Sequence, residues 1–247
     1  MLGKRVKVTV DRPLGTCHPQ HKDLYYPINY GYIEGVIAPD GEEQDAYILG
    51  VDKPVSGFEG IVIAIIHRNN DVEEKWVVAP EGKLFTKDEI KASVHFQEQF
   101  FDTEIIMMEV KFYESVDEAL LKFAVIAAKS DGKWVFCKHK QRDTYEFPGG
   151  HREAGESIME TACRELYEET GALQYDLNPV CYYSVTSPDA FNGVETFGLL
   201  CFAEITEFES NLHSEIEKII LTDNLPNNWT YPLIQPLLLA ELKKTNC

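Results

Sequence analysis

One stretch of the chain reads as a helix whose two sides differ sharply in character. Residues 157–170 are Ser-Ile-Met-Glu-Thr-Ala-Cys-Arg-Glu-Leu-Tyr-Glu-Glu-Thr, and Gly171 follows where a helix C-cap is expected. Ile158, Ala162 and Leu166 share one stripe at helical spacing. The pattern therefore predicts a helix that packs against a core through this stripe.

Three acidic residues of the same stretch lie beside that stripe. Glu165, Glu168 and Glu169 are spaced i, i+3 and i+4, so a helix projects them from one side. Like charges held this close raise one another's pKa unless a cation lies between them. Carboxylate oxygens suit Mg²⁺ or Mn²⁺ better than zinc. Taken alone, this spacing is more often found on an acidic helix face that simply contacts solvent. If the three carboxylates instead bind a metal, the helix predicts chemistry on a diphosphate.

Composition limits the classes of partner. The 247 residues carry a formal net charge of −18, which disfavours a nucleic-acid polymer or an anionic membrane as partner. A small phosphorylated substrate stays compatible, because a metal can bridge it to carboxylates. The six cysteines are scattered without a CxxC pair, and the amino-terminal residues lack an apolar leader, so we expect a reduced cytoplasmic protein.

The chain length and the restart of the pattern near residues 112–118 predict two domains, 1–117 and 118–247. In the first, short apolar strands such as 6–10, 61–66 and 76–79 alternate with turns, and Thr86 begins a helix over 86–100. This pattern predicts short strands joined by loops, with one helix.

The second domain begins with two apolar strands, 122–128 and 133–138, around the hairpin signal Ser-Asp-Gly. The acidic helix, strands near 180–187 and 195–205, and a last helix within 231–244 follow. This order predicts an α/β/α sandwich.

A longer string around the acidic helix resembles the Nudix box, Gly-x5-Glu-x7-Arg-Glu-aliphatic-x-Glu-Glu-x-Gly-aliphatic. It is filled without a gap from Gly150 to Ala172, and the resemblance covers roughly residues 119–247. The matching positions are Gly150, Glu156, Arg164, Glu165, Leu166, Glu168, Glu169, Gly171 and Ala172.

The resemblance implies a Mg²⁺-dependent enzyme in which water attacks a nucleoside diphosphate linked to another group. Glu165, Glu168 and Glu169 would bind the metal, with the Gly150 carbonyl as a further ligand, while Arg164 and Glu156 brace the loop. The general base would be Glu165 or a later glutamate, Glu215 or Glu217; these alternatives stay open.

Substrate choice depends on residues before and after the box. Residues 145–150, Tyr-Glu-Phe-Pro-Gly-Gly, resemble the lead-in of antimutator Nudix enzymes that cleave oxidised dGTP to the monophosphate and pyrophosphate. Lys138, Lys140 and Arg142 form a basic patch that could hold phosphates or a base edge, or simply face solvent. Later aromatic residues could stack a base, although most aromatic side chains belong to cores; they are Tyr182, Tyr183, Phe191 and Phe197.

The first domain has an acidic pattern of its own, Asp40, Glu42 and Asp45, beside an Asp-Gly turn. It is either a simple turn or a second metal site. Together with Asp11-Arg12, the Tyr-Pro-Ile-Asn-Tyr-Gly-Tyr-Ile run at 26–33 and Lys75, this pattern resembles soluble family I inorganic pyrophosphatases over roughly residues 5–105. That resemblance implies a small α+β barrel and a second site of Asp40, Glu42, Asp45, Arg12, Tyr30 and Lys75.

Several positions depart from the pyrophosphatase pattern. Glu42 stands where the family has its middle aspartate, and Arg68 stands where a metal-binding aspartate is expected, which would repel Mg²⁺. Phe100 and Phe101 replace a Tyr-Lys pair that grips phosphate. We therefore expect a degenerate barrel, a candidate dimerisation surface or a wall over the neighbouring pocket.

Three functions follow in order of support. The first is a Nudix hydrolase that converts a nucleoside triphosphate, oxidised or normal, to the monophosphate and pyrophosphate. The second is a bifunctional enzyme whose first domain also hydrolyses pyrophosphate. The third is a sensor that binds a ligand such as ADP-ribose without cleaving it, against which the complete carboxylate set argues.

Overall fold

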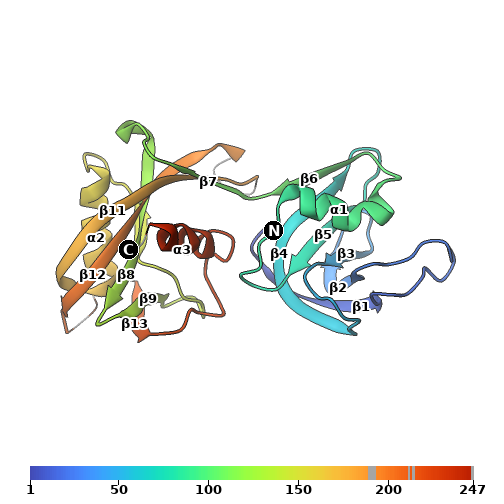
Figure 1. Ribbon diagram of the computed structural model, residues 1–247, viewed down its shortest axis with the longest axis horizontal. Helices are drawn as coiled ribbons and strands as arrows, with labels where there is room; N and C mark the ends of the chain where they lie inside the picture. Colours follow the sequence, from blue (N-terminus) through green and yellow to red (C-terminus); the bar gives the residue numbers. More distant parts are fainter. Residues whose placement is uncertain (189–192, 211, 213–214, 246–247) are drawn as a thin grey trace. The chain divides into compact units, whose positions relative to one another are not determined.

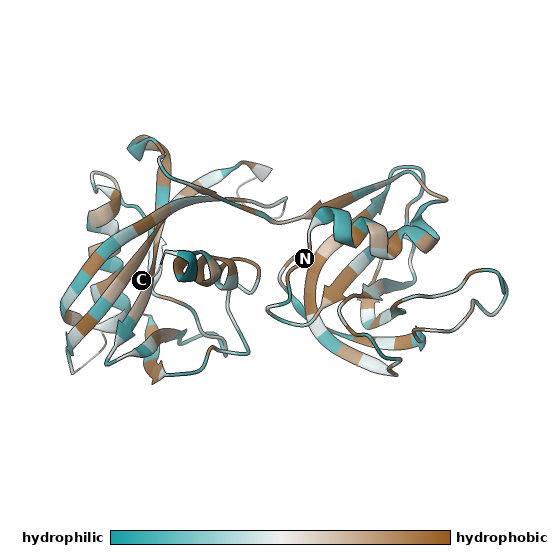
Figure 2. Ribbon diagram, viewed as in Figure 1, coloured by the Kyte–Doolittle hydropathy of each residue, from teal (hydrophilic) through white to brown (hydrophobic). Residues whose placement is uncertain are grey.

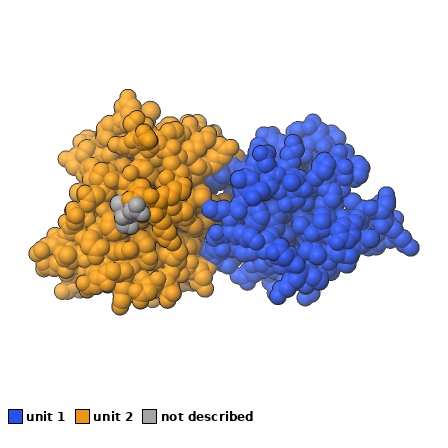
Figure 3. Space-filling view, viewed as in Figure 1, with its two compact units in different colours: residues 1–108 blue, residues 109–247 orange. Residues whose placement is uncertain are grey.

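The computed structural model describes residues 1–188, 193–210, 212 and 215–245. The chain divides into two compact units, residues 1–108 and 109–247, coloured separately in Figure 3. The sequence pattern placed the division after residue 117. The structure places it earlier because the segment Glu109–Tyr113 (β7) pairs with a strand of the second unit, with Tyr113 opposite Tyr182.

The first unit is a closed five-stranded barrel. Its strands follow the order β1-β2-β3-β5-β4, and β4 returns to pair with β1. The barrel strands are β1 (Arg5–Arg12), β2 (Asn29–Ile37), β3 (Glu43–Ile48), β4 (Gly57–Arg68) and β5 (Glu74–Ala79). An additional strand, β6 (Thr103–Met107), extends the sheet beside β4. Figure 1 shows the helix α1 (Lys87–Glu98) beside β5 and β6.

Local sequence signals explain this unit well. Thr86 caps α1 in a capping box with Glu89, as the Thr-x-x-Glu spacing predicts. The strands contain long apolar stretches, whereas α1 alternates between hydrophilic and hydrophobic residues (Figure 2). The barrel interior is filled by fully buried side chains from different strands, including Val8, Val62 and Val78. The predicted small barrel is therefore present.

The second unit is a twisted sheet flanked by helices. The order of the sheet is β13-β9-β8-β12-β11-β7, with the short β10 paired to β8. Its strands are β8 (Leu121–Ser130), β9 (Lys133–His139), β10 (Gly149–His151), β11 (Ala172–Thr186), β12 (Thr196–Phe208) and β13 (Ile216–Thr222). In Figure 1, α2 (Ile158–Thr170) lies against one side of this sheet and α3 (Gln235–Lys244) against the other.

The acidic helix is docked as its apolar stripe predicts. Ile158, Ala162 and Leu166 are buried in one cluster with Leu121 and Leu199 of the sheet. The helix ends at Gly171, which adopts φ 72°. That left-handed conformation is costly for residues with a Cβ, so glycine fixes where α2 stops and where β11 begins.

Two further observations concern the chain as a whole. The cysteines among the described residues are free thiols, and Cys247 lies outside those residues. Across the described parts of the chain, helices are too short or too polar to span a membrane.

Candidate active site

The carboxylates of α2 meet the short strand β10. The Oε2 atom of Glu169 accepts a hydrogen bond of 2.9 Å from the backbone N–H of Gly149. Glu165 lies against Gly150, because a Cβ at that glycine would come within 2.2 Å of its Oε1. Glycine at position 150 therefore leaves the space that the Glu165 carboxylate occupies.

Arg164 connects the same helix to the preceding loop. Its Nε donates to Glu156 Oε1 at 2.7 Å, and its Nη1 donates to Glu165 Oε1 at 2.7 Å and to Glu168 Oε2 at 3.1 Å. Its Nη2 donates to Glu156 and to the carbonyl of His151. One guanidinium thus bonds three carboxylates and a carbonyl of β10.

The electrostatics differ strongly among these acids. Hydrogen bonds from Arg164 lower the pKa of Glu156 to about 2. Burial raises the pKa of Glu169 to about 8, and the nearby charges of Glu146, Glu165 and Glu215 add to the effect. Burial also raises the pKa of Glu165. A cation placed here would relieve both the burial cost and the mutual repulsion.

The donor chemistry is suited to a hard divalent ion. Carboxylate oxygens dominate the site, and Glu165 and Glu169 lie at the β10 glycines. Within the described residues, groups of three or more His, Cys, Asp or Glu side chains arranged to hold a metal are absent. Arg164 already holds Glu165 and Glu168, so a metal would have to compete with its guanidinium. The residue types fit Mg²⁺ or Mn²⁺, in a conformation that the arginine stabilises.

The predicted basic patch is largely engaged by acids. Lys138 Nζ lies 2.5 Å from Glu217 Oε2 and 3.3 Å from Asp143. Arg142 Nη1 lies 3.5 Å from Glu146 Oε2. The backbone N–H of Lys140 binds the carbonyl of Glu215. These residues therefore lie at the β9–β13 edge, where Lys138 and Arg142 are paired with carboxylates.

The aromatic candidates for base stacking have different surroundings. Tyr183 is buried and its ring lies 5.4 Å from that of Phe123. Tyr182 and Phe197 pack against the core under α2. Phe191 lies outside the described residues. Core packing accounts for the three described rings.

A functional feature that the sequence did not single out is Glu146. Its side chain is 9% exposed, and burial raises its pKa. It acts electrostatically on Glu169 and is ion-paired with Arg142. The only signal in the sequence was an acid placed between the aromatic residues Tyr145 and Phe147.

In the first unit, some of the predicted site residues lie together and others lie apart. Lys75 Nζ donates to Tyr30 at 2.7 Å, to Asp45 at 2.8 Å and to Glu73 at 2.6 Å. Burial disfavours the charged form of Asp45, but the Lys75 charge and the hydrogen bonds from Lys75 and Tyr30 together outweigh burial and lower the pKa of Asp45. Tyr30, Asp45 and Lys75 are therefore brought together, as predicted.

The remaining predicted residues of that unit lie apart from this cluster. Asp40 and Glu42 are exposed, and Asp40 Oδ1 accepts the backbone N–H of Glu42 at 3.0 Å within the loop. Arg12 pairs with Asp11 at 2.5 Å. These contacts match the simple-turn reading of the Asp40–Glu42 segment better than a metal site.

Arg68 lies in the interior of the first unit. Its side chain is 1% exposed, and it donates to Glu98 through Nε at 3.0 Å and Nη2 at 2.8 Å. It also binds Glu73, and its guanidinium lies 3.5 Å from the ring centre of Phe101. Glu98 in turn accepts from Tyr47. Arg68 and Lys75 thus neutralise Glu98, Glu73 and Asp45 from within the unit.

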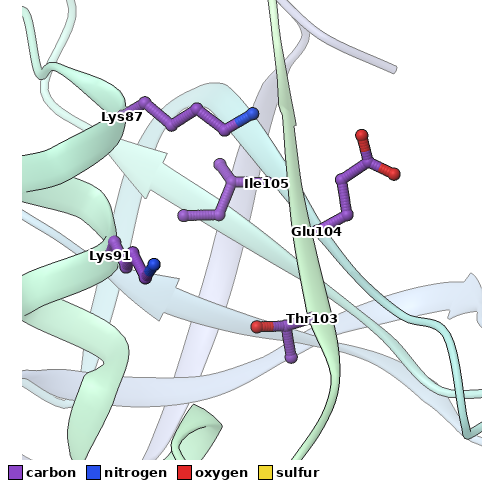
Figure 4. Close-up of a pocket in the computed structure, with 5 residues that line it drawn as sticks. All are labelled: Lys87, Lys91, Thr103, Glu104 and Ile105. Carbon is purple, nitrogen blue, oxygen red and sulfur yellow. The ribbon is translucent and has the colours of Figure 1, made fainter.

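A pocket of about 170 Å³ lies between α1 and β6 of the first unit. Figure 4 shows Lys87 and Lys91 reaching from α1 toward Ile105 of β6. None of the residues predicted for either site lines this pocket, so we assign no role to it.

Comparison with known proteins identifies the second unit. Residues 120–222 match the family model of the NUDIX domain. They form a Nudix domain. Over 108 residues the chain is 32% identical to the Bacillus subtilis protein YtkD, a candidate 8-oxo-dGTP diphosphatase. The match covers 43% of this chain and 65% of YtkD, slightly less than two thirds of that relative.

Two solved structures are similar to parts of the chain. The Bacillus subtilis pyrophosphohydrolase BsRppH is 25% identical, with a TM-score of 0.48, covering 57% of this chain and 92% of that one. The inorganic pyrophosphatase of Ehrlichia chaffeensis is 18% identical, with a TM-score of 0.34, covering 42% of this chain and 85% of that one. The Nudix prediction is confirmed for residues 120–222. The pyrophosphatase likeness of the first unit remains a prediction.

Proposed function

We propose that the Nudix domain is a Mg²⁺- or Mn²⁺-dependent diphosphatase acting on a small nucleoside diphosphate derivative. The observation that carries this proposal is the joint placement of Glu165 and Glu169 at the β10 glycines, braced by Arg164. The finer proposal is a nucleoside triphosphate, oxidised or normal, cleaved to the monophosphate and pyrophosphate. It is supported by residues 145–150 and by the similarity to YtkD.

The residues would share the work as follows. Glu165, Glu168 and Glu169, with the Gly150 carbonyl, would hold the metal, which neutralises phosphate charge and lowers the pKa of a bound water. Arg164 and Glu156 keep the loop and helix in register. The Gly149 N–H fixes one oxygen of Glu169, so that its other oxygen is oriented.

The two later glutamates differ as candidates for the general base. Glu217 is bonded to Lys138, which lowers its pKa and makes it a weak base. The Glu215 charge raises the pKa of both Glu169 and Glu146, so Glu215 acts electrostatically on the metal-ligand candidate Glu169. We therefore propose Glu215 over Glu217, with Glu165 as the alternative within the helix.

The decisive experiment is turnover of a substrate panel by the purified full chain with Mg²⁺. The panel contains oxidised and normal dNTPs, ADP-ribose, dinucleoside polyphosphates and pyrophosphate. We expect Glu168→Gln and Glu169→Gln to reduce kcat by at least about 100-fold, as expected when charge stabilisation at phosphorus is lost. Glu153→Gln, an exposed carboxylate of the same loop, should retain activity. Unchanged turnover in both helix variants would reject the site.

For the first unit we propose a barrel without pyrophosphatase activity. The buried Arg68 and Lys75 are bonded to Asp45, Glu73 and Glu98, which leaves these acids neutralised from within. In the same panel, phosphate release from pyrophosphate is expected to be absent. Release that persists in Glu169→Gln but disappears in Asp45→Asn would instead establish a bifunctional enzyme.

A further inference from the structure

The segment that leads into the Nudix box is held by residues beyond the matched domain. The backbone N–H of Tyr145 donates to the carbonyl of Asn228 at 3.0 Å, and the N–H of Thr230 donates to the carbonyl of Tyr145 at 2.9 Å. The hydroxyls of Thr144 and Thr230 lie 2.7 Å apart. Residues 228–230 thus run alongside residues 144–145 as a short parallel pairing.

The other side of the same segment is paired with β9. Cys137 and Glu146 exchange backbone hydrogen bonds of 2.8 Å and 3.0 Å. Two residues further on, the carbonyl of Pro148 accepts from the backbone N–H of Ile126 in β8 at 2.8 Å. The backbone from Tyr145 to Pro148 is therefore bonded on both flanks.

The backbone N–H of Phe147 lies within this buried segment and is bonded by a side chain. It donates to Oε1 of Gln235 at 2.9 Å. Phe147 and Gln235 are each 2% exposed. A buried N–H without an acceptor is strongly disfavoured, so an apolar residue at position 235 would leave this group unsatisfied.

Trp229 completes the contact between the two segments. Its ring centre lies 5.5 Å from that of Phe147 and 5.3 Å from that of Phe136 on β9. The indole therefore packs the lead-in segment against the sheet while Gln235 fixes its backbone. Gln235 is the first residue of α3, so a shift of this helix would also shift the segment 144–147.

We infer that residues 228–235 form a clamp on residues 144–147, in which Gln235 is a positioning residue for the active site. Resting on the proposed function, the clamp acts through Phe147 on two nearby residues, Glu146 directly before it and Gly149 two positions after it. Glu146 carries the charge next to Glu169, and Gly149 donates the N–H that orients Glu169. The clamp contacts no substrate itself.

The test is Gln235→Met, which preserves size and removes the acceptor. Amide hydrogen exchange should show the Phe147 N–H exchanging about tenfold faster, in proportion to the lost bond. With the substrate that the panel identifies, kcat should fall by about 10- to 100-fold, as small misplacements of reacting groups do. KM should change by less than about threefold, because groups that bind substrate are untouched.

The matched control is Leu239→Ala, a buried residue of the same helix that makes no hydrogen bond to the segment through its side chain. It should lower the melting temperature at least as much as Gln235→Met, yet leave kcat within about threefold. An equal fall of kcat in both variants, or an unchanged Phe147 exchange rate in Gln235→Met, would overturn the inference.

Two further measurements cover the cases in which Gln235→Met does not fold or the wild-type chain shows no turnover. If Gln235→Met fails to fold, Thr230→Val tests the clamp at its other end, and exchange at Tyr145 should rise while the fold persists. If the wild-type chain turns over none of the panel, the proposed function is lost, whereas the exchange measurements still report whether Gln235 holds Phe147.

Discussion

Replacing Arg68 by methionine is expected to destabilise the first unit severely. The change removes a guanidinium that is 1% exposed and leaves the Glu98 side chain, 4% exposed, without its cation. Leaving one partner of a buried ion pair uncompensated costs about 3–5 kcal/mol. In a unit of this size, each kcal/mol lowers the melting temperature by about 4 °C. The expected loss is therefore about 12–20 °C.

The double variant Arg68→Met/Glu98→Gln separates the lost pair from the stranded charge. Glutamine keeps an acceptor for the Tyr47 hydroxyl but carries no charge. We expect it to recover most of the lost stability, because the main cost is the isolated carboxylate. Arg5→Met, an arginine whose side chain is 39% exposed, should cost less than about 1 kcal/mol.

Thermal unfolding of the full chain gives the melting temperatures, and hydrogen exchange of β4 and β5 peptides assigns the transition to the first unit. A single variant within about 2 °C of wild type would refute the reasoning, as would a double variant no more stable than the single one. Either result would mean that Arg68 does not neutralise a buried acid.

Two further predictions concern the Nudix site. Gly150→Ala should weaken Mg²⁺ binding in calorimetry while shifting the melting temperature little, because the new methyl displaces only the flexible end of Glu165; unchanged affinity would contradict this placement. Burial raises the pKa of Glu169 from 4.5 to about 8, so the metal-free folded protein binds more protons than the unfolded chain between these values. Its free energy of unfolding should therefore fall as pH rises through this window. In urea unfolding at a series of pH values, Glu169→Gln should show a smaller fall of this free energy over the same window.

The sequence predicted the local features of both units well. The helix at 158–170 could be placed with both ends, because an apolar stripe and a C-cap glycine are encoded within a few residues of one another. The β8–β9 hairpin followed in the same way from Asp131 and Gly132, which adopt φ 50° and 77° as such a turn requires. These features depend on neighbours in sequence.

Contacts between distant residues were not predictable from pattern alone. Arg68 was interpreted as a cation that repels Mg²⁺, but its partner Glu98 lies 30 positions away with no signal linking the two. Gln235 and Phe147 are 88 positions apart. The strand β13 was missed because its residues form a weakly alternating run that becomes a strand by pairing with β9. Such pairings are decided by tertiary packing.

Burial distinguishes Arg68 from Arg164 in how readily each could give up its carboxylates to a metal. Each holds several carboxylates, but Arg164 is 21% exposed whereas Arg68 is 1% exposed. Water can solvate the Arg164 guanidinium if a divalent ion takes over Glu165 and Glu168, so that exchange costs little. Displacing Arg68 would strand a cation in the barrel interior, where its desolvation is expensive. If the carboxylates of α2 bind a metal as proposed, Arg164 would organise them and then yield to the ion, whereas Arg68 would stay bound to Glu98.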